Sequence, residues 1–379
     1  MWEYYNPVKI NFGRSIRSKI FSKINSDKIL LICSKKGKQR FISDKILSKI
    51  VIEKNIIWLD QINDTPDIQE IDNHISNLKD EKFELIIAFG GGSVIDSAKA
   101  IFFYYNCKNK NLTIKDLISR DVKINFKKKV SLLVLPTTSG TGSEVTQFAT
   151  IWDKQNKKKY SIDNERIFPD FAFIDSELTD GLPEDITLYT GLDAINQSIE
   201  SMWNKNASDF TIHLAIKSLK LGFNSIKNIF KKKDSPLFRN NMSQSSMLSG
   251  LCISQTRTAI CHSISYPLTS HYSVPHGLAC SFTMLEVLKK VIKKDDGRFK
   301  KLATELGISN GKASDLISLF EDFNRKCQIK EKIKYYINDL DLLLELVPEM
   351  YTKERADKCL VSFDLKDIKR IVANSYQNS

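Results

Sequence analysis

The first half of the chain alternates short apolar runs with segments of helical spacing. The apolar runs predict strands at Val8–Phe12, Lys28–Cys33, Ile56–Leu59, Leu85–Phe89, Val130–Leu135 and Phe171–Ile174. Between them, apolar residues recur every three or four positions in Phe41–Val51, Ile68–Leu78 and Val94–Phe103. Strands that alternate with helices in this way predict a parallel sheet covered by helices.

After Pro183 the pattern changes to helical spacing alone. The predicted helices are Ile186–Trp203, Phe210–Ile229, Asn241–Cys252, Phe282–Val291, Phe299–Leu306 and Ala313–Phe323. A chain of 379 residues is long for a single core. We therefore predict an α/β domain over residues 1–182 and an all-helical domain over residues 183–379.

Composition narrows the class of protein. Hydrophobic residues make up 42% of the chain, yet no run approaches the roughly 20 apolar residues of a membrane span. The seven cysteines are scattered without a Cys-x-x-Cys pair, which is typical of reduced cytosolic thiols. The net charge of +12 comes from dispersed lysines without interleaved aromatic residues. We expect a cytoplasmic protein that binds neither a membrane nor nucleic acid.

A glycine-rich turn follows one of the predicted strands. Leu85–Phe89 runs into Gly90, Gly91, Gly92 and Ser93, and a helical pattern follows. Glycines allow a phosphate to approach the backbone, and the N–H groups and dipole of a helix N-terminus favour an anion. The turn matches neither the Gly-x-Gly-x-x-Gly fingerprint nor a P-loop, so a purely structural turn is the alternative.

A second polar loop follows the strand Val130–Leu135. It contains Thr137, Thr138, Thr141 and Ser143, whose hydroxyl groups could bind phosphate or ribose. A hydroxyl-rich surface loop is the alternative. Both loops lie at the carboxyl ends of predicted parallel strands, where open α/β sheets bind their ligands. Together they predict a nucleotide site.

Three of the five histidines, His262, His271 and His276, lie within Thr258–Gly277. Imidazole is the commonest side-chain ligand for a divalent metal. We expect a helical run that ends at Tyr266, a break at Pro267, and two imidazoles brought to one point. A helix cap and surface histidines are the alternative for any single residue.

Four motifs occur in order along the chain: Gly90–Lys99, Pro136–Glu144, Gly191–Ala194 and Pro275–Gly277. Together they resemble the iron-containing (group III) alcohol dehydrogenase family, over nearly the whole chain. The resemblance implies a dehydroquinate synthase-like fold with a Rossmann-like dinucleotide-binding domain and an all-α domain. It also implies an NAD(P)-dependent oxidoreductase with one divalent metal, Fe²⁺ or Zn²⁺, in the cleft between the domains.

By motif, the resemblance assigns the metal ligands to Asp193, Gln197, His262 and His276. Gln197 stands where the family usually has histidine, and an amide oxygen is generally a weaker ligand than imidazole. The catalytic positions are His262 and Tyr266, and Tyr266 replaces a second histidine found in many members. A tyrosine could orient the carbonyl or relay a proton, but it does not titrate near neutrality.

The resemblance also assigns cofactor-binding positions, at Gly90, Gly91, Gly92, Ser93, Asp96, Thr137, Thr138, Thr141, Ser143 and Leu178. Lys35 and Lys36 follow the predicted strand Lys28–Cys33. Many NAD-using relatives have an aspartate at the position of Lys35. Basic side chains there would attract a 2′-phosphate, which favours NADP(H) over NAD(H).

Within the family, the segments Gln197–Trp203, Thr256–Thr258 and Ser265–Thr269 resemble phosphonoacetaldehyde reductases. These enzymes reduce phosphonoacetaldehyde to 2-hydroxyethylphosphonate, a step of phosphonate biosynthesis. Arg257 would then be a catalytic-site residue that holds the phosphonate through its guanidinium. A continuous helix would turn Arg257 away from His262, so this role needs a non-helical start to the segment. A surface or structural charge is the alternative.

Three other functions compete with this interpretation. The first is a metal-dependent alcohol dehydrogenase that acts on another small alcohol or aldehyde. The second is a dehydroquinate synthase-like lyase, and the third is a nucleotide-binding relative that has lost its metal. The sequence leaves a homodimer open and does not decide the direction of the reaction.

Overall fold

The computed structural model describes residues 1–109, 112–119, 123–229, 235–308 and 311–377. They form two compact units. The unit that we call the α/β unit comprises Asn6–Thr138 and Gly142–Asp180. The helical unit comprises Gly181–Ser379 together with two short segments from earlier in the chain, Met1–Tyr5 and Ser139–Thr141.

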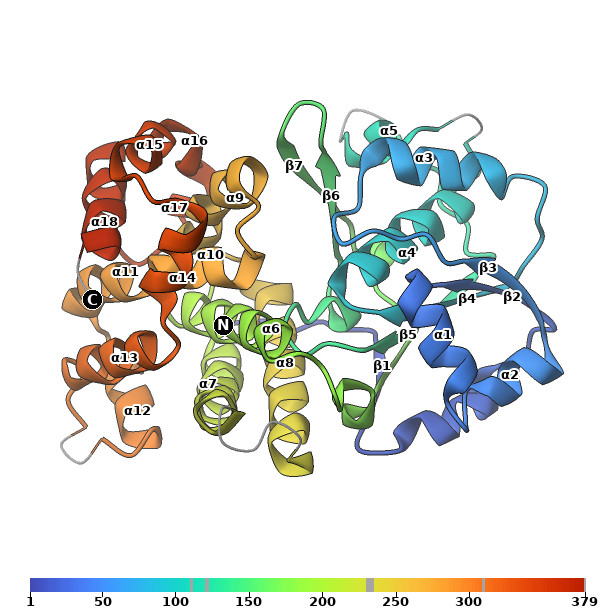
Figure 1. Cartoon of the computed structure of the whole chain (residues 1–379), viewed down its shortest axis with the longest axis horizontal. Coiled ribbons are helices and arrows are strands. Elements are labelled where there is room, and N and C mark those ends of the chain that lie inside the picture. Colours follow the sequence, from blue (N-terminus) through green and yellow to red (C-terminus); the bar gives the residue numbers. More distant parts are fainter. Residues whose placement is uncertain (110–111, 120–122, 230–234, 309–310, 378–379) are drawn as a thin grey trace. The chain divides into compact units, whose positions relative to one another are not determined.

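The α/β unit is built on a six-stranded parallel sheet, as the alternating pattern predicts (Figure 1). Its strand order is β1-β8-β5-β4-β2-β3. The strands are β1 (Lys9–Phe12), β2 (Lys28–Ile32), β3 (Asn55–Leu59), β4 (Leu85–Gly90), β5 (Ser131–Pro136) and β8 (Phe171–Ile174). Gly90 lies opposite Pro136 in the β4–β5 register. The glycine-rich turn and the hydroxyl-rich loop therefore leave the sheet side by side.

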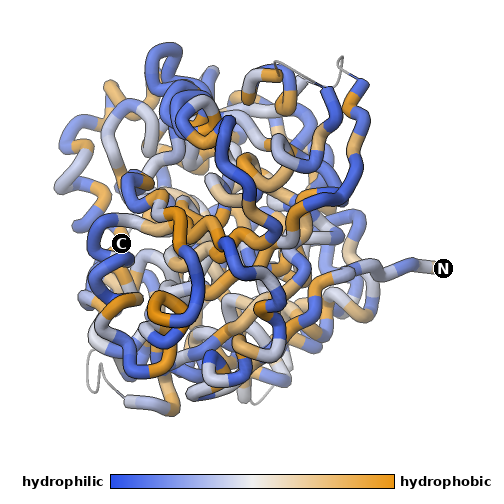
Figure 2. The backbone as a smooth tube through the Cα atoms, turned by 90° about the vertical axis from the view of Figure 1, so that its right-hand side faces the viewer, coloured by the Kyte–Doolittle hydropathy of each residue, from blue (hydrophilic) through white to orange (hydrophobic). Residues whose placement is uncertain are grey.

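Helices cover both faces of this sheet. On one face, η1 (Ile16–Lys23), α1 (Lys35–Ser43) and α2 (Ser48–Glu53) pack against alternate residues of the central strands. On the other, α4 (Gly92–Tyr105) packs on β4 and β5, with α3 (Ile68–Asn77) and α5 (Ile114–Ile118) beside it. Hydrophobic segments gather at the centre in Figure 2, inside hydrophilic ones.

The single helix predicted at Phe41–Val51 is wrong, because the chain forms the separate helices α1 and α2 there. The Asp44 carboxylate accepts hydrogen bonds from the backbone N–H groups of Ile46 and Leu47. This local bonding competes with the helical pattern and turns the chain.

An antiparallel hairpin, β6 (Phe148–Asp153) with β7 (Lys158–Asp163), was not predicted from the sequence. The turn contains Lys157 with φ of 52°, a conformation for which the sequence has no glycine signal. The hairpin is held to the segment that leads into α3, because the Trp152 N–H donates to the carbonyl of Pro66.

The described part of the helical unit contains no strand, in agreement with the predicted all-helical region. The helices that matter for the site are α6 (Glu184–Met202), α7 (Asp209–Ile229), α8 (Pro236–Thr256), α9 (Ile260–Tyr272) and α10 (His276–Phe282). The outer helices are α11 (Met284–Val291), α12 (Arg298–Glu305), α13 (Asp315–Lys326), α14 (Ile329–Tyr336), α15 (Leu340–Glu345), α16 (Val347–Met350), α17 (Lys353–Ala356) and α18 (Leu365–Gln377).

The break predicted at Pro267 is wrong, because α9 continues through this residue to Tyr272. Proline removes one intrahelical hydrogen bond but leaves the rest of the ladder. Ile264 and Leu268, on either side of it, are fully buried in the core of the helical unit. Their packing holds the helix together across the proline.

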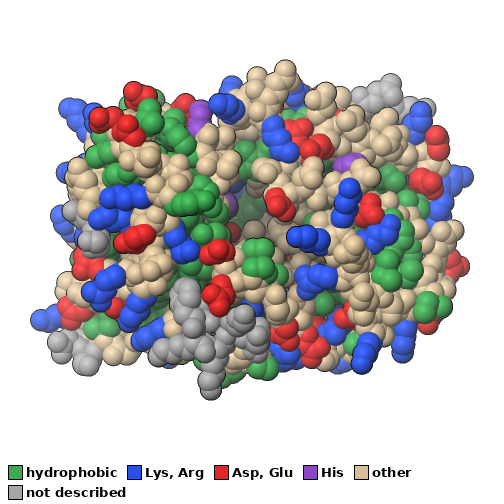
Figure 3. Space-filling model, in the orientation of Figure 1, with side chains coloured by type: hydrophobic (Ala, Val, Ile, Leu, Met, Phe, Trp, Pro, Cys, Tyr) green, Lys and Arg blue, Asp and Glu red, His purple; other side chains and the backbone are tan. Residues whose placement is uncertain are grey.

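None of the described helices is long and apolar enough to cross a membrane. On the face in Figure 3, lysine and arginine side chains are interspersed with aspartate and glutamate. The positive net charge is therefore distributed on this face rather than gathered into one basic patch.

Candidate active site

The site in the helical unit depends on a close approach of α10 to α6. A Cβ atom at Gly277 would lie only 1.8 Å from the backbone oxygen of Tyr189 on α6. Only glycine leaves room for this approach. Pro275 precedes α10, so His276 is the first residue of the helix and lies directly next to this contact.

Four potential metal-binding side chains converge there: Asp193 from α6, His262 from α9, and His276 and Cys280 from α10. Their ligand atoms all lie within 4.8 Å of one another. His262 Nε2 is 3.4 Å from Asp193 Oδ1, and Cys280 Sγ is 3.7 Å from each ring nitrogen of His276. One carboxylate, two imidazoles and a thiol form a donor set that fits a divalent transition metal.

Glu200 fixes one of these histidines. Its carboxylate lies 2.7 Å from His262 Nδ1 and also accepts hydrogen bonds from the backbone N–H groups of Ala259, Cys261 and His262. The carboxylate therefore caps the N-terminus of α9 and holds a proton on Nδ1, which leaves Nε2 directed towards Asp193.

The charged neighbours of His262 and Glu200 shift the pKa values of both groups. Burial alone would lower the pKa of His262, but Cys280, Glu200 and the contact with Asp193 raise it well above its ordinary value. Burial alone would raise the pKa of Glu200, but His262 and the backbone donors hold it below its usual range. The carboxylates of Glu200 and Asp193 thus favour positive charge at this cluster, as a cation site requires.

Gln197, a predicted ligand, has other partners in the structure. Its Nε2 donates to the carbonyl oxygen of Thr141 at 3.2 Å, and the Ser249 hydroxyl donates to its Oε1 at 2.9 Å. Because a carbonyl can only accept, the amide nitrogen must face Thr141 and the amide oxygen must face Ser249. Thr141, a predicted cofactor contact, lies in the short segment that belongs to the helical unit.

An aromatic ring and a guanidinium extend the cluster. The ring of Tyr266 lies nearly parallel to that of His276, at an angle of 17° and a centroid distance of 6.3 Å. Arg355 belongs to α17, and its guanidinium lies 5.1 Å from the centre of the Tyr266 ring. Arg355 also donates to the hydroxyl of Thr258. The sequence analysis did not single out this arginine.

Arg257, the predicted phosphonate ligand, lies in the non-helical link between α8 and α9. Its backbone has φ of 62° and ψ of 171°, a region that residues other than glycine rarely adopt. Since α9 begins only at Ile260, the helical rotation that argued against this residue does not apply. The link itself is held because the side chain of Asn204 donates to the Thr256 carbonyl.

The glycine-rich turn of the α/β unit has the geometry of an anion cradle. Gly90 ends β4, Gly91 is the N-cap of α4, and Gly92 is its first residue. A Cβ atom at Gly91 would lie 3.0 Å from the hydroxyl of Thr138, so the second loop lies directly against this turn. The Thr137 N–H donates to the carbonyl of Gly90. The Ser93 hydroxyl donates to the carbonyl of Asp64.

Two other predicted cofactor contacts form part of a buried network. The Ser143 hydroxyl donates to Asp96 at 2.5 Å, and the fully buried Lys99 donates to Ser143, Thr146 and the carbonyl of Phe148. Burial lowers the pKa of Lys99 to about 8 and raises that of the nearby Glu144 to about 7. This network joins α4 to the chain after β5.

The lysines proposed for cofactor choice begin α1. Lys35 and Lys36 are exposed in its first turn, and no ion pair among the described residues includes them. Lys38 instead pairs with Asp60 at 2.8 Å. Leu178 is buried, and its carbonyl accepts a hydrogen bond from Arg40 at 2.5 Å.

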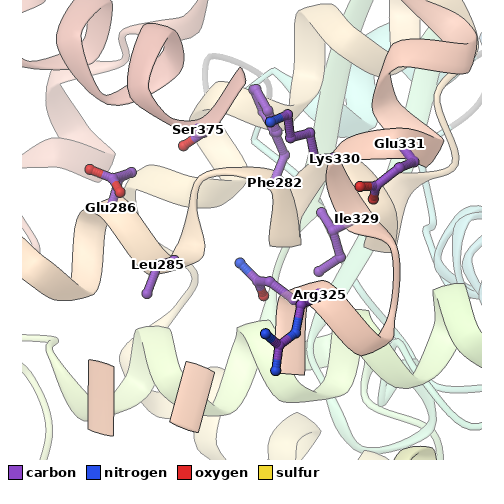
Figure 4. Close-up of a pocket in the computed structure, with 9 residues that line it drawn as sticks. Phe282, Leu285, Glu286, Arg325, Ile329, Lys330, Glu331 and Ser375 are labelled. Atoms are coloured by element: carbon purple, nitrogen blue, oxygen red, sulfur yellow. The ribbon is translucent and has the colours of Figure 1, made fainter. Parts of the chain in front are cut away.

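A separate cavity lies among the outer helices, between α10, α11, α13, α14 and α18 (Figure 4). Its volume is about 40 Å³, and charged side chains such as Glu286, Lys330 and Glu331 line it. One water molecule needs about 10–15 Å³ of such space, so this cavity has room for only a few water molecules and is not assigned to a substrate.

Comparison with known proteins identifies the family. A model of the iron-containing alcohol dehydrogenases matches residues 7–176, and a model of the C-terminal region of the Fe-containing alcohol dehydrogenase family matches residues 187–376. The chain belongs to the iron-containing alcohol dehydrogenase family. It is therefore a metal-dependent oxidoreductase of the alcohol dehydrogenase and aldehyde reductase class, with an NAD(P) cofactor.

Relatives of this dehydrogenase include proteins named as alcohol dehydrogenases. It is 28% identical to an NADPH-dependent butanol dehydrogenase of Clostridium saccharobutylicum, over 89% of this chain and 87% of the relative. It is 29% identical to a 1-propanol dehydrogenase of Salmonella typhimurium, over 79% of this chain and 77% of the relative. None of these names specifies a phosphonate.

Two solved structures share the fold over 100% of both chains, each with a TM-score of 0.88 and 23% identity. One is an iron-containing alcohol dehydrogenase from Thermococcus thioreducens. The other is a sulfoacetaldehyde reductase from Bifidobacterium kashiwanohense in complex with NAD⁺.

Proposed function

We propose that this dehydrogenase uses NADPH to reduce phosphonoacetaldehyde to 2-hydroxyethylphosphonate. The observation that carries the proposal is the guanidinium of Arg355, which lies one aromatic ring away from His276. A dianionic aldehyde needs a fixed cation close to the group that activates its carbonyl, and a guanidinium binds a phosphonate through two parallel hydrogen bonds. Arg257 remains a second candidate for this role.

A divalent metal held by Asp193, His262 and His276 would act as a Lewis acid that polarises the aldehyde carbonyl. The protein supplies the alignment. Glu200 keeps the Nδ1 proton on His262, so that Nε2 presents its lone pair to the cluster. The ring of Tyr266 lies beside that of His276, and its hydroxyl group would donate a hydrogen bond to the substrate oxygen and relay a proton to that oxygen as the alcohol forms.

In the α/β unit, we propose that Gly91, Gly92 and the N-terminus of α4 bind the cofactor pyrophosphate. Thr137 and Thr138 support the ribose and nicotinamide end. The nicotinamide carries the hydride to the carbonyl carbon, and the protein contributes orientation and charge.

The substrate proposal is tested by following NADPH absorbance with metal-supplemented protein and four aldehydes. These are phosphonoacetaldehyde, sulfoacetaldehyde, propanal and butanal. Two charge-assisted hydrogen bonds should favour phosphonoacetaldehyde over propanal by at least about 100-fold in kcat/KM. Equal values for phosphonoacetaldehyde and propanal would contradict the proposal, and a preference for butanal would favour an aliphatic alcohol dehydrogenase.

Arginine variants identify the phosphonate ligand. Arg355→Gln should remove the preference for phosphonoacetaldehyde and leave propanal reduction nearly unchanged. Arg257→Gln would show this effect instead if Arg257 were the ligand. The control is Arg325→Gln, since Arg325 has a side chain 75% exposed and pairs with Asp322 on the outer helix α13.

For the cofactor, we propose that Lys35 and Lys36 bind the 2′-phosphate of NADPH. The NADPH named for the butanol dehydrogenase of Clostridium saccharobutylicum is consistent with this choice. The double variant Lys35→Ala/Lys36→Ala should raise KM for NADPH at least about tenfold and change KM for NADH little. Lys45→Ala, at an exposed lysine just after α1, serves as control. An unchanged ratio of the two KM values would contradict the assignment.

A further inference from the structure

We propose that Cys280, rather than Gln197, supplies the fourth protein ligand of the metal, so that the set Asp193, His262, His276 and Cys280 selects Zn²⁺. The inference rests on the proposed function only in that a divalent metal binds at this cluster. It adds a thiolate to a site for which the sequence suggested an amide.

The separations between ligand atoms support this assignment. In a tetrahedral zinc site, metal–nitrogen distances of about 2.0–2.1 Å and a metal–sulfur distance of about 2.3 Å place neighbouring ligand atoms roughly 3.3–3.6 Å apart. His262 Nε2 and Asp193 Oδ1 are 3.4 Å apart, and Cys280 Sγ is 3.7 Å from the nitrogens of His276. All four ligand atoms lie within 4.8 Å of one another, so the wider pairs would close by up to about 1.5 Å to contact one ion.

The local backbone explains why the cysteine is in place. His276 and Cys280 are four residues apart on α10 and therefore lie on the same face of the helix. The contact of Gly277 with Tyr189 turns this face towards α6, where Asp193 lies. Cys280 is fully buried, so its thiolate would need a bound cation to offset the cost of burying a charge.

The amide of Gln197 already makes hydrogen bonds to two other groups. Its oxygen accepts a hydrogen bond from Ser249 and its nitrogen faces the Thr141 carbonyl. Turning the oxygen to a metal would break both bonds and leave the Thr141 carbonyl without this donor. Cys280 can reach the cluster without such a cost.

A thiolate changes which metal the site prefers. Cysteine is a soft ligand that favours Zn²⁺, whereas carboxylate and water favour harder ions. Zinc can also expand from four to five ligands, which leaves room for the carbonyl oxygen of a substrate. The site is thereby a zinc site within a family named for iron.

The test is X-ray absorption spectroscopy at the zinc edge on the purified full-length protein reconstituted with Zn²⁺. The wild type should show one sulfur neighbour at about 2.3 Å. Cys280→Ser should lose it and bind Zn²⁺ at least about tenfold more weakly in competition with a chelator. Gln197→Ala should keep the sulfur neighbour. Cobalt gives an independent readout, since a Co²⁺–thiolate charge-transfer band in the near ultraviolet should follow the same pattern.

The control is Cys261→Ser, a fully buried cysteine on α9 next to His262 but outside the cluster, which should keep the sulfur neighbour. Zinc bound by the wild type without sulfur would overturn the inference and leave the proposed reduction intact. Failure of the wild type to bind any divalent metal would overturn both. The wild-type spectrum alone decides the matter if Cys280→Ser does not fold.

Discussion

Glu200 contacts the metal cluster through His262 without belonging to it. One carboxylate receives three backbone N–H groups and the Nδ1 side of His262, all inside the protein. Such a group joins α6 to the start of α9 and fixes the orientation of an imidazole. A second carboxylate–histidine pair, Glu349 with His271, lies exposed on the outer end of α9 at a similar distance.

We predict that Glu200→Gln destabilises the protein by about 3–5 kcal/mol, because it leaves His262 and the backbone donors with an uncharged partner of poorer geometry. Metal affinity should fall by about 10–100-fold as the imidazole loses its orientation. Urea denaturation and chelator competition measure the two effects.

The matched control is Glu349→Gln, which removes the exposed pair and should change stability by less than about 1 kcal/mol. Equal losses in the two variants would show that burial of Glu200 has no special role.

Individual residues were predictable where a short motif carries them. Asp193, His262 and His276 were expected in one site, and the structure brings the three together. Cys280 carried a usable signal, since it lies one helical turn after His276 on the same face. Glu200 likewise lies seven residues after Asp193. Arg355 had no local signal, because only the packing of α17 against α9 places it beside Tyr266.

At the scale of elements, strand prediction was easiest for β2, β4, β5 and β8, because these strands are mostly buried and contain continuous apolar runs. The edge strands β1 and β3 are only partly buried. The β6–β7 hairpin was not predicted, for the opposite reason. Its second strand, Lys158–Asp163, is largely polar and partly exposed, so burial gives no periodic signal. The ends of helices were predicted wrongly where a single side chain ends the helix, as Asp44 does between α1 and α2.

The packing of α10 on α6 gives a prediction at this scale. Gly277→Ala places a methyl group within 1.8 Å of the Tyr189 carbonyl, so the two helices must separate. We expect a loss of at least about 2 kcal/mol in unfolding free energy, together with loss of metal binding. Chemical denaturation and zinc analysis measure the result.

Gly297→Ala provides a comparison, because its Cβ would meet nothing within 4 Å and only its φ of 105° resists the change. It should cost about 1 kcal/mol and leave zinc content unchanged. A Gly277→Ala protein with full stability would contradict the close approach of α10 and α6.

At the scale of the whole molecule, buried charge makes stability depend on pH. Burial raises the pKa of Glu144 from its ordinary 4.5 to about 7. Between these values the folded protein holds a proton that the unfolded chain releases. Stability should therefore fall as pH rises from about 5 to 7, by at most about 1.4 kcal/mol per pH unit from this group.

Glu144→Gln should remove this pH-dependent loss of stability. The unfolding free energy of the variant should therefore rise relative to that of the wild type between pH 5 and 7. Urea denaturation at several pH values measures it. Glu165→Gln, at an exposed carboxylate, should follow the wild type. Parallel curves for wild type and Glu144→Gln would contradict the raised pKa.

All four members of the metal cluster lie in the helical unit, and none of the described residues of the α/β unit belongs to it. Mass action then makes the folding free energy of the helical unit a function of free metal concentration. Each tenfold rise above the dissociation constant adds about 1.4 kcal/mol to it. The α/β unit receives no such direct contribution. Metal starvation would therefore act unevenly, leaving the nucleotide cradle folded while the helical unit approaches its melting point.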